Sequence, residues 1–251
     1  MENKIRFFKR IPVGALGTNC YIVSGGGENA AVIDPGADFG RIQAVLDGNH
    51  LRAETVLLTH GHFDHHRAAK QFQAVGAKIY MHAADEQKIA YAPRTVKPIL
   101  FKPDGYVCDN AAILNAGSER NCVQTRRGER KIRSLFPINE EFSVEAATQY
   151  QRNLSALETA GLRFTVIHTP GHTPGGVCYY LDADGILFSG DTLFHGDVGR
   201  TDFEGGDFGQ LKESILNKLY ALPDNTVVYP GHGEETTVGE EKRYNECVRQ
   251  G

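Results

Sequence analysis

The chain has 251 residues, and its 27 Lys and Arg residues against 31 Asp and Glu residues give a net charge of −4 with neutral histidines. Hydrophobic residues make up 41% and charged residues 23%, a globular composition that excludes an intrinsically disordered chain. A slightly acidic chain also lacks the basic surface of a general polyanion binder, so no nucleic-acid partner is expected. The 28 glycines predict many tight turns and loops, where functional sites are usually built.

The sequence predicts a cytoplasmic protein with no membrane partner. The N-terminus lacks the charged start and apolar run of a signal peptide, and no apolar stretch approaches the ~18–20 residues of a membrane helix. The cysteine count is odd and no pair has C-x-x-C spacing, which indicates neither a disulfide framework nor a cysteine zinc site. We expect reduced thiols that act as small core residues. The five are Cys20, Cys108, Cys122, Cys178 and Cys247.

Short apolar runs rich in Val, Ile, Tyr and Phe predict buried strands, and helical patterns lie between some of them. Together they indicate a layered α/β protein. In chain order, the sequence predicts strands at 20–23 and 30–33, a helix at 41–46, a strand at 55–58, a helix at 66–75, a strand at 78–81, helices at 83–90 and 144–160, strands at 164–168, 177–181 and 186–188, a helix at 208–219, a strand at 226–229 and a helix at 239–248.

The segment from about 92 to 143 differs from the rest because it contains several prolines and little periodicity. We therefore expect a single domain over 1–251 with an insertion or lid at about 92–143. Residues 119–133 contain six Lys and Arg residues, a local basic cluster on an acidic protein. This cluster is either a solvated loop or part of a lid that attracts an anionic substrate.

The segment 59–66 carries the strongest chemical signal. Its candidate metal ligands His60, His62, Asp64 and His65 lie within six positions, directly after the apolar run 56–58. A strand that leads into a glycine-containing turn and then a helix would let all four converge. A helix alone could not, because its faces recur at i+3 and i+4 rather than at i+2. Histidine together with carboxylate suits zinc, iron or manganese, so the spacing predicts a metal site.

Three later motifs each place a candidate ligand beside a glycine after an apolar run. They are His172 in TPGHTPGG, Asp191 in FSGDT and His232 in YPGHG. Loops at one edge of a sheet can offer ligands in this way. Seven ligands exceed the four that one tetrahedral zinc takes, but they suit two metals that share a bridging carboxylate. Two metals ~3.5–4 Å apart can hold and activate a water between them.

With these motifs the chain resembles the metallo-β-lactamase-fold hydrolase superfamily, in its glyoxalase II-like (hydroxyacylglutathione hydrolase-like) branch. The metal motifs match in order and kind. Upstream, VIDPG at 32–36 and TNCY at 18–21 resemble the family's opening strands, and GRTD at 199–202 resembles a segment common in this branch. The resemblance covers about 1–90 and 160–250. It implies a four-layer αβ/βα sandwich, with the metal site at one edge between two mixed sheets.

The resemblance also implies a role for each ligand. Two divalent metals are expected, zinc foremost, with iron and manganese as alternatives. His60, His62 and His172 should hold the first metal, Asp64, His65 and His232 the second, and Asp191 should bridge them. Asp34 matches an acid that orients metal ligands, and the alternative is that it only caps the turn before Pro-Gly.

The implied chemistry is hydrolysis of a carbonyl substrate by a hydroxide that bridges the metals, formed from a water that ionises near pH ~7. Asp64 and Asp191 are the candidate catalytic residues, because either could orient the hydroxide and move its proton. Ser189 is interpreted as a loop residue, since no Gly-x-Ser-x-Gly elbow surrounds it. Thioesters are the favoured substrates because a thiolate leaves readily. Because β-lactamases of this superfamily generally lack a carboxylate like Asp191, an antibiotic-resistance enzyme is not expected.

Some features leave other functions open. Only 19 residues follow His232, too few for the C-terminal extension that contacts glutathione in lactoylglutathione-cleaving enzymes. His195 either touches substrate or is an exposed loop histidine, and His50, His66 and His82 are not expected to be ligands. The alternatives are a mono-iron persulfide dioxygenase, which needs no ligand at His232, a lactonase or phosphodiesterase, and a non-catalytic metal-binding protein. The expected partner is a small-molecule substrate, which is anionic if the basic cluster binds it. The chain is expected to be a monomer or a homodimer.

Overall fold

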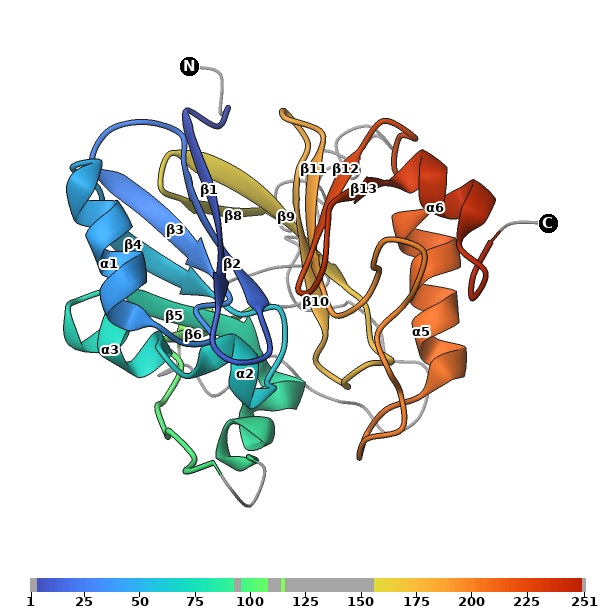
Figure 1. Ribbon diagram of the computed structural model, residues 1–251, viewed down its shortest axis with the longest axis horizontal. Helices are drawn as coiled ribbons and strands as arrows, with labels where there is room; N and C mark the ends of the chain where they lie inside the picture. Colours follow the sequence, from blue (N-terminus) through green and yellow to red (C-terminus); the bar gives the residue numbers. More distant parts are fainter. Residues whose placement is uncertain (1–3, 93–95, 108–113, 116–155, 250–251) are drawn as a thin grey trace, which may run out of the picture.

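The computed structural model describes residues 4–92, 96–107, 114–115 and 156–249. Two β-sheets lie face to face, with α1 and α3 on the outer side of one sheet and α5 and α6 on the outer side of the other (Figure 1). The basic cluster at 119–133 and most of the predicted helix 144–160 fall outside the described residues. The predicted lid at 92–143 is described only in part, so the domain organisation stays a prediction.

The first sheet is mixed and follows the chain order from β1 to β7. Antiparallel pairing joins β1, β2 and β3, and parallel pairing continues from β3 through β6, with β7 antiparallel at the edge. Every residue of β2 is buried, as expected of a strand covered on both faces. The strands are β1 (Phe7–Val13), β2 (Thr18–Ser24), β3 (Asn29–Ile33), β4 (Arg52–Leu57), β5 (Lys78–His82), β6 (Gly105–Val107) and β7 (Leu114–Asn115).

The second sheet is also mixed, with the order β13-β12-β11-β10-β9-β8. Only β11 and β12 pair in parallel among its described strands. Its strands are β8 (Ala156–Thr159), β9 (Leu162–His168), β10 (Val177–Leu181), β11 (Ile186–Gly190), β12 (Val227–Pro230) and β13 (Thr236–Thr237). All eight predicted strands are therefore confirmed, whereas β1 was not predicted, because its Lys and Arg residues interrupt the apolar run.

The helices are short, and polar side chains cap the N-termini of some of them. Asp207 and Thr237 precede α5 and α6, and each side chain accepts a hydrogen bond from a backbone N–H in the first turn. The helices are α1 (Phe39–Gly48), α2 (Phe63–His66), α3 (Ala69–Ala74), a 3₁₀ helix η1 (Ala83–Ala90), α5 (Phe208–Ser214), a π-helical continuation η2 (Ile215–Leu219) and α6 (Val238–Tyr244). No helix within the described ranges has both the length and the apolar character needed to span a bilayer.

Three sequence interpretations are wrong in detail. The predicted helix 66–75 is divided between α2 and α3. The described end of the predicted helix 144–160 is strand β8, because Ala160 and Gly161 both have positive φ and form a tight turn that pairs β8 with β9. Ser189 is buried within β11 rather than in a loop, and its hydroxyl donates to the Leu193 carbonyl.

Three apolar clusters fill the spaces between the layers, which confirms the four-layer αβ/βα sandwich. One lies between the first sheet and its helices, one between the two sheets, and one between the second sheet and α5 and α6. Fully burying a side chain such as Phe188 or Leu57 contributes about 1.5–3 kcal/mol. Cys20 and Cys178 are buried as predicted, whereas Cys247 is exposed, and Cys108 and Cys122 lie outside the described residues.

Candidate metal centre

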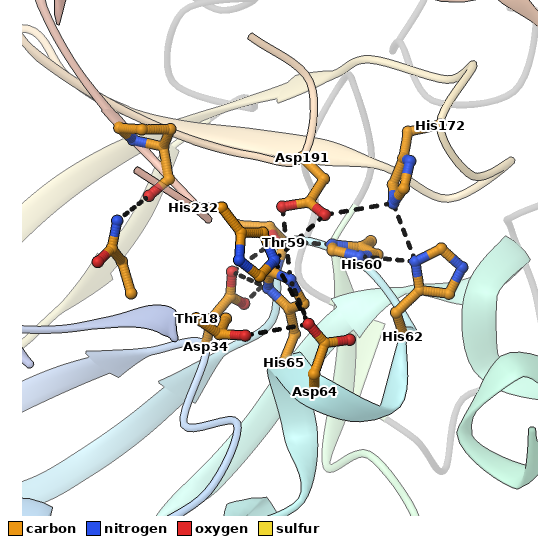
Figure 2. Close-up of polar contacts among 12 residues, drawn as sticks. Thr18, Asp34, Thr59, His60, His62, Asp64, His65, His172, Asp191 and His232 are labelled. Atoms are coloured by element: carbon orange, nitrogen blue, oxygen red, sulfur yellow. Dashed lines mark hydrogen bonds and ion pairs between the residues drawn. The ribbon is translucent and has the colours of Figure 1, made fainter. Parts of the chain in front are cut away.

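The structure brings all seven predicted ligands to one edge of the sandwich, where strands of both sheets end (Figure 2). The turn after β4 and the short helix α2 supply four of them from the first sheet, and three loops of the second sheet supply the others. His60 and His62 follow β4, Asp64 and His65 lie on α2, His172 lies between β9 and β10, Asp191 follows β11, and His232 follows β12.

His60, His62 and His172 form the three-histidine group. Nε2 of His60 lies 3.0 Å from Nδ1 of His62, and Nε2 of His172 lies 2.9 Å from that same nitrogen. A tetrahedral zinc with Zn–N bonds of about 2.0–2.1 Å keeps its nitrogen ligands roughly 3.3 Å apart. Three ring nitrogens that converge at this spacing therefore suit a divalent cation, which would replace their mutual contacts.

Asp64, His65 and His232 form the acid–histidine group. Oδ2 of Asp64 lies 3.6 Å from Nε2 of His65 and 3.4 Å from Nε2 of His232. His65 is fully buried, and its Nε2 makes no hydrogen bond with any described residue. An unsatisfied buried nitrogen among carboxylates is costly unless it has a further partner, which a metal ion would provide.

Asp191 lies between the two groups and contacts both. Its Oδ1 is 3.4 Å from Nε2 of His65, and its Oδ2 is 3.6 Å from Nε2 of both His172 and His232. Oδ1 is buried and makes no hydrogen bond within the described part of the chain. This carboxylate is therefore placed where a ligand shared by two cations would be.

A chain of hydrogen bonds behind the ligands fixes which ring nitrogens face the centre. Oδ2 of Asp34 accepts from Nδ1 of His65 at 2.9 Å and from the Thr59 hydroxyl at 2.6 Å. Since the Thr59 hydroxyl donates to Asp34, its oxygen is left to accept from Nδ1 of His60, 3.1 Å away. Nε2 of His60 and of His65 is thereby directed to the centre. Asp34 has a φ of 50°, a left-handed value that Asp adopts more readily than most residues.

Other supporting residues were not predicted as part of the site. The Arg200 carbonyl accepts from Nδ1 of His172 at 2.7 Å, and the Thr18 hydroxyl donates to Oδ2 of Asp64 at 3.0 Å. The Asn19 side chain donates to the carbonyls of Pro230 and Gly233, on either side of His232. The TNCY motif at 18–21 was the available signal, but it was interpreted as part of an opening strand.

Burial keeps the three-histidine group neutral. Burial lowers the pKa of His62 to about 3, with a further contribution from the neighbouring His172 and His65. The pKa of His60 is held well below its usual range, and that of His172 is also lowered, in both cases mainly by burial. A neutral imidazole has the free lone pair that a metal requires, so this group is suited to bind a cation at neutral pH.

The histidines of the acid–histidine group have pKa values shifted in the opposite direction. Burial acts to lower the pKa of His65, but the carboxylates of Asp191 and Asp34 outweigh it and raise that pKa well above its usual range. Burial likewise opposes charge on His232, yet the contact with Asp64 raises its pKa. The pKa values of Asp64 and Asp191 are lowered, because their histidine contacts outweigh burial.

The other histidines lie outside the donor groups found among the described residues. His195 and His50 are exposed. His66 is buried and packs against the ring of Phe101 at 5.4 Å, and the ring of His82 stacks on that of His168 at 4.3 Å.

Two cavities each include one candidate ligand in their lining. On the His62 side, a cavity of about 310 Å³ is lined by Lys88, Tyr91 and Phe203, and the Phe203 ring lies edge-on to His62 at 5.7 Å. On the Asp64 side, a cavity of about 530 Å³ is lined by Leu16, Phe39, Phe63, Arg67 and their neighbours. Each cavity therefore adjoins a residue of the centre.

Comparison with known proteins agrees with this geometry. The model of the metallo-beta-lactamase superfamily matches residues 13–232. Hydroxyacylglutathione hydrolase GloC of Haemophilus influenzae is 32% identical over 240 residues, which cover 94% of each chain.

Solved structures share the fold. The crystal structure of the BLEG-1 B3 metallo-beta-lactamase is 31% identical, with a TM-score of 0.69 and coverage of 96% of this chain and 99% of that one. TTHA1623, crystallised in a di-iron-bound form, is 29% identical, with a TM-score of 0.65 and coverage of 95% and 98%. The family match over most of the chain, together with the sandwich and its cluster of histidines and carboxylates, shows that this chain belongs to the metallo-beta-lactamase superfamily.

Proposed function

We propose that this chain is a dinuclear metal-dependent hydrolase that cleaves a carbonyl substrate, most favourably a thioester. The observation that carries the proposal is the position of Asp191, whose two oxygens face the three-histidine group and the acid–histidine group. A single-metal centre would not need His232, yet this residue lies 3.4 Å from Asp64 and completes the second donor group.

The chain's own residues account for binding, orientation and proton movement. His60, His62 and His172 would hold one ion, and Asp64, His65 and His232 the other, with Asp191 shared between them. When bound, two such ions supply Lewis acidity and lower the pKa of a water to about 7.

The two carboxylates have further roles. Thr18 donates to Oδ2 of Asp64, which holds that carboxylate toward the centre. The oxygens of Asp64 and Asp191 can accept the proton of an attacking water and return it to product. Both are hydrogen-bond acceptors when ionised, so they also orient that water.

Thioesters suit this centre because a thiol has a pKa of about 8.5 and leaves as thiolate without a proton from the enzyme. The cavities lined in part by His62 and by Asp64 are the candidate binding sites for the acyl part and the thiol part. The 32% identity to a protein named hydroxyacylglutathione hydrolase favours the same substrate class.

A β-lactam is the second candidate substrate. The supporting observation is the 31% identity to the B3 metallo-beta-lactamase BLEG-1 over nearly the whole chain. The expectation that Asp191 excludes this activity stays a prediction, and the substrate comparison below tests it.

The test combines elemental analysis with a substrate panel on protein purified without chelator. We expect about two metal ions per chain, with zinc distinguished from iron and manganese in the same measurement. The panel comprises S-lactoylglutathione, a lactone, a phosphodiester, a β-lactam, and a persulfide with oxygen uptake recorded. The highest kcat/KM is expected for the thioester. One iron per chain with oxygen uptake and no hydrolysis would overturn the proposal.

A further inference from the structure

Asp85 is a buried carboxylate in η1 that contacts two of the ligand loops but is not itself a candidate ligand. Its side chain is fully buried. Oδ2 accepts a hydrogen bond from the backbone N–H of Gly61 at 2.9 Å, and Oδ1 accepts one from the backbone N–H of Gly175 at 2.6 Å. Gly61 lies between His60 and His62, and Gly175 follows His172 by three residues. One carboxylate thus joins the two loops that supply the three-histidine group.

A role in the helix alone does not explain these contacts. Asp85 lies in the first turn of η1, where an acidic residue can interact favourably with free N–H groups of its own helix. The two hydrogen bonds of its side chain instead go to residues 24 and 90 positions away in the sequence. The carboxylate is therefore used between segments rather than within the helix.

The two glycines allow this close approach. A Cβ on Gly61 would lie 2.7 Å from the Asp85 carbonyl oxygen, and a Cβ on Gly175 would lie 2.7 Å from the Asp85 carboxyl carbon. Any other residue at either position would push its loop away from Asp85. Both loops are thus packed directly against the same residue, at the places where they present their histidines.

The energetics favour holding both loops together. A buried carboxylate is costly to desolvate unless its oxygens are hydrogen-bonded, and bonds from N–H groups to an ionised acceptor are about twice as strong as neutral ones. If either loop moved away, one carboxylate oxygen would lose its partner in the protein interior. The position of one loop is therefore coupled to the position of the other.

We propose that Asp85 is a positioning residue that sets the spacing of His60, His62 and His172 by holding Gly61 and Gly175 on one carboxylate. The proposal rests on the proposed metal centre, because its consequence is the metal affinity of the three-histidine group. The acid–histidine group, whose residues Asp64, His65 and His232 form no hydrogen bond with Asp85, keeps its affinity.

The test is Asp85→Asn, in which one acceptor oxygen becomes an NH₂ group that faces a backbone N–H. Supporting residues behind metal ligands typically change metal affinity by about 10–100-fold, and we expect a loss in this range for one of the two metals. The measurement is a competition titration of chelator-treated protein against a chromophoric chelator. The same titration in His232→Gln and His62→Gln backgrounds assigns the loss, which should occur only where the three-histidine group is intact.

Asp104→Asn is the matched control. Oδ2 of Asp104 also accepts from a backbone N–H, that of Ile79 at 2.9 Å, and from the Gln73 side chain at 2.9 Å, but it contacts no ligand loop. This variant should lose thermal stability while both metal affinities stay within about two-fold of the unaltered protein.

The outcomes separate the two proposals. If the unaltered protein does not bind two metals, the proposed function fails. If it binds two, and Asp85→Asn lowers stability as Asp104→Asn does without changing either affinity, or weakens both metals equally, the positioning role is overturned.

A second measurement needs no variant and covers the case in which Asp85→Asn does not fold. In the unaltered metal-free protein, the backbone N–H groups of Gly61 and Gly175 should exchange slowly with solvent deuterium, because both are bonded to a buried carboxylate. Fast exchange of both would overturn the proposal.

Discussion

The three-histidine group and the acid–histidine group share one centre, yet the pKa values of their histidines are shifted in opposite directions. Around His60, His62 and His172, burial dominates and the pKa values fall. Around His65 and His232, carboxylates outweigh burial and the pKa values rise. The difference lies in where the acids are placed, since Asp191 and Asp34 contact His65, and Asp64 contacts His232.

This contrast indicates that the two groups are prepared for a metal in different ways. The three-histidine group presents neutral nitrogens, and the hydrogen bonds to Nδ1 of His60 and His172 direct Nε2 to the centre. The acid–histidine group presents negative charge that attracts a cation, but its histidines share protons with the carboxylates until a metal displaces them. Asp191 belongs to both arrangements, so changing it should have the largest effect.

Asp191→Asn removes the charge that the two groups share while keeping the side-chain volume. We expect metal content to fall from two ions to at most one, and kcat/KM to fall by roughly 10³-fold, equivalent to about 4 kcal/mol of lost stabilisation. Elemental analysis and thioester kinetics on the same sample check both effects. Two retained metals with near-normal turnover would show that Asp191 is not the shared ligand.

His62→Gln and His232→Gln separate the two groups. Each variant should lose one metal and retain the other, and each should lose at least about 10²-fold in kcat/KM, because one Lewis acid is absent. Cobalt loading followed by absorption spectroscopy would report a different remaining site in each variant. If His232→Gln kept two metals and full activity, the acid–histidine group would not be a metal site.

The comparison also explains what could be predicted from the sequence. Four ligands fall within six residues after β4, and the other three each lie in a glycine-rich motif after a strand, so local patterns were sufficient to find them. The buried strands were found for the same reason, since β2, β3 and β10 are continuous apolar runs.

What the sequence missed depends on contacts between distant segments. Asp85 bonds to residues 24 and 90 positions away, and Asn19 bonds to carbonyls more than 200 residues away. Asp85 lies in no recognised motif, and the TNCY motif that contains Asn19 does not by itself show where its side chain bonds. Strand β8 was missed for a related reason, because pairing with β9 rather than local periodicity determines its conformation.

Asp34→Asn should have a smaller effect than loss of a ligand. The new NH₂ group cannot accept a hydrogen bond from Nδ1 of His65. The neutral ring would therefore favour the tautomer with its proton on Nε2, the nitrogen that faces Asp64 and Asp191. We expect a loss of about 10–100-fold in metal affinity, concentrated in the acid–histidine group. The competition titration checks this.

Thr18→Val provides a comparison for Asp34→Asn. This substitution removes a hydroxyl that donates to Asp64, a member of the acid–histidine group, but it leaves the His65 tautomer unchanged. The loss of metal affinity should therefore be smaller than in Asp34→Asn. Equal losses in the two variants would argue against a tautomer effect.

The smallest effect concerns the pH dependence of stability in the metal-free protein. Below the unfolded-state histidine pKa of about 6.5, the unfolded chain takes up protons that His60, His62 and His172 resist in the folded state, so stability falls as pH falls. The raised pKa values of His65 and His232 have the opposite effect. They stabilise the folded state fully below about pH 6.5, and this stabilisation is lost as the pH rises through the folded-state pKa values. The two groups therefore predict maximum stability near pH ~6.5.

Thermal unfolding of chelator-treated protein between about pH 5 and pH 9 checks this prediction. The Tm should decline by a few degrees on each side of the maximum, since 1 kcal/mol corresponds to about 2–4 °C in a chain of this size. Asp191→Asn should reduce the decline in Tm at alkaline pH, because the carboxylate that most raises the His65 pKa is gone. The decline in Tm at acid pH should remain, because it depends on burial of the three-histidine group. An alkaline decline that persists unchanged in Asp191→Asn would mean that Asp191 does not raise the pKa of His65 as its position indicates.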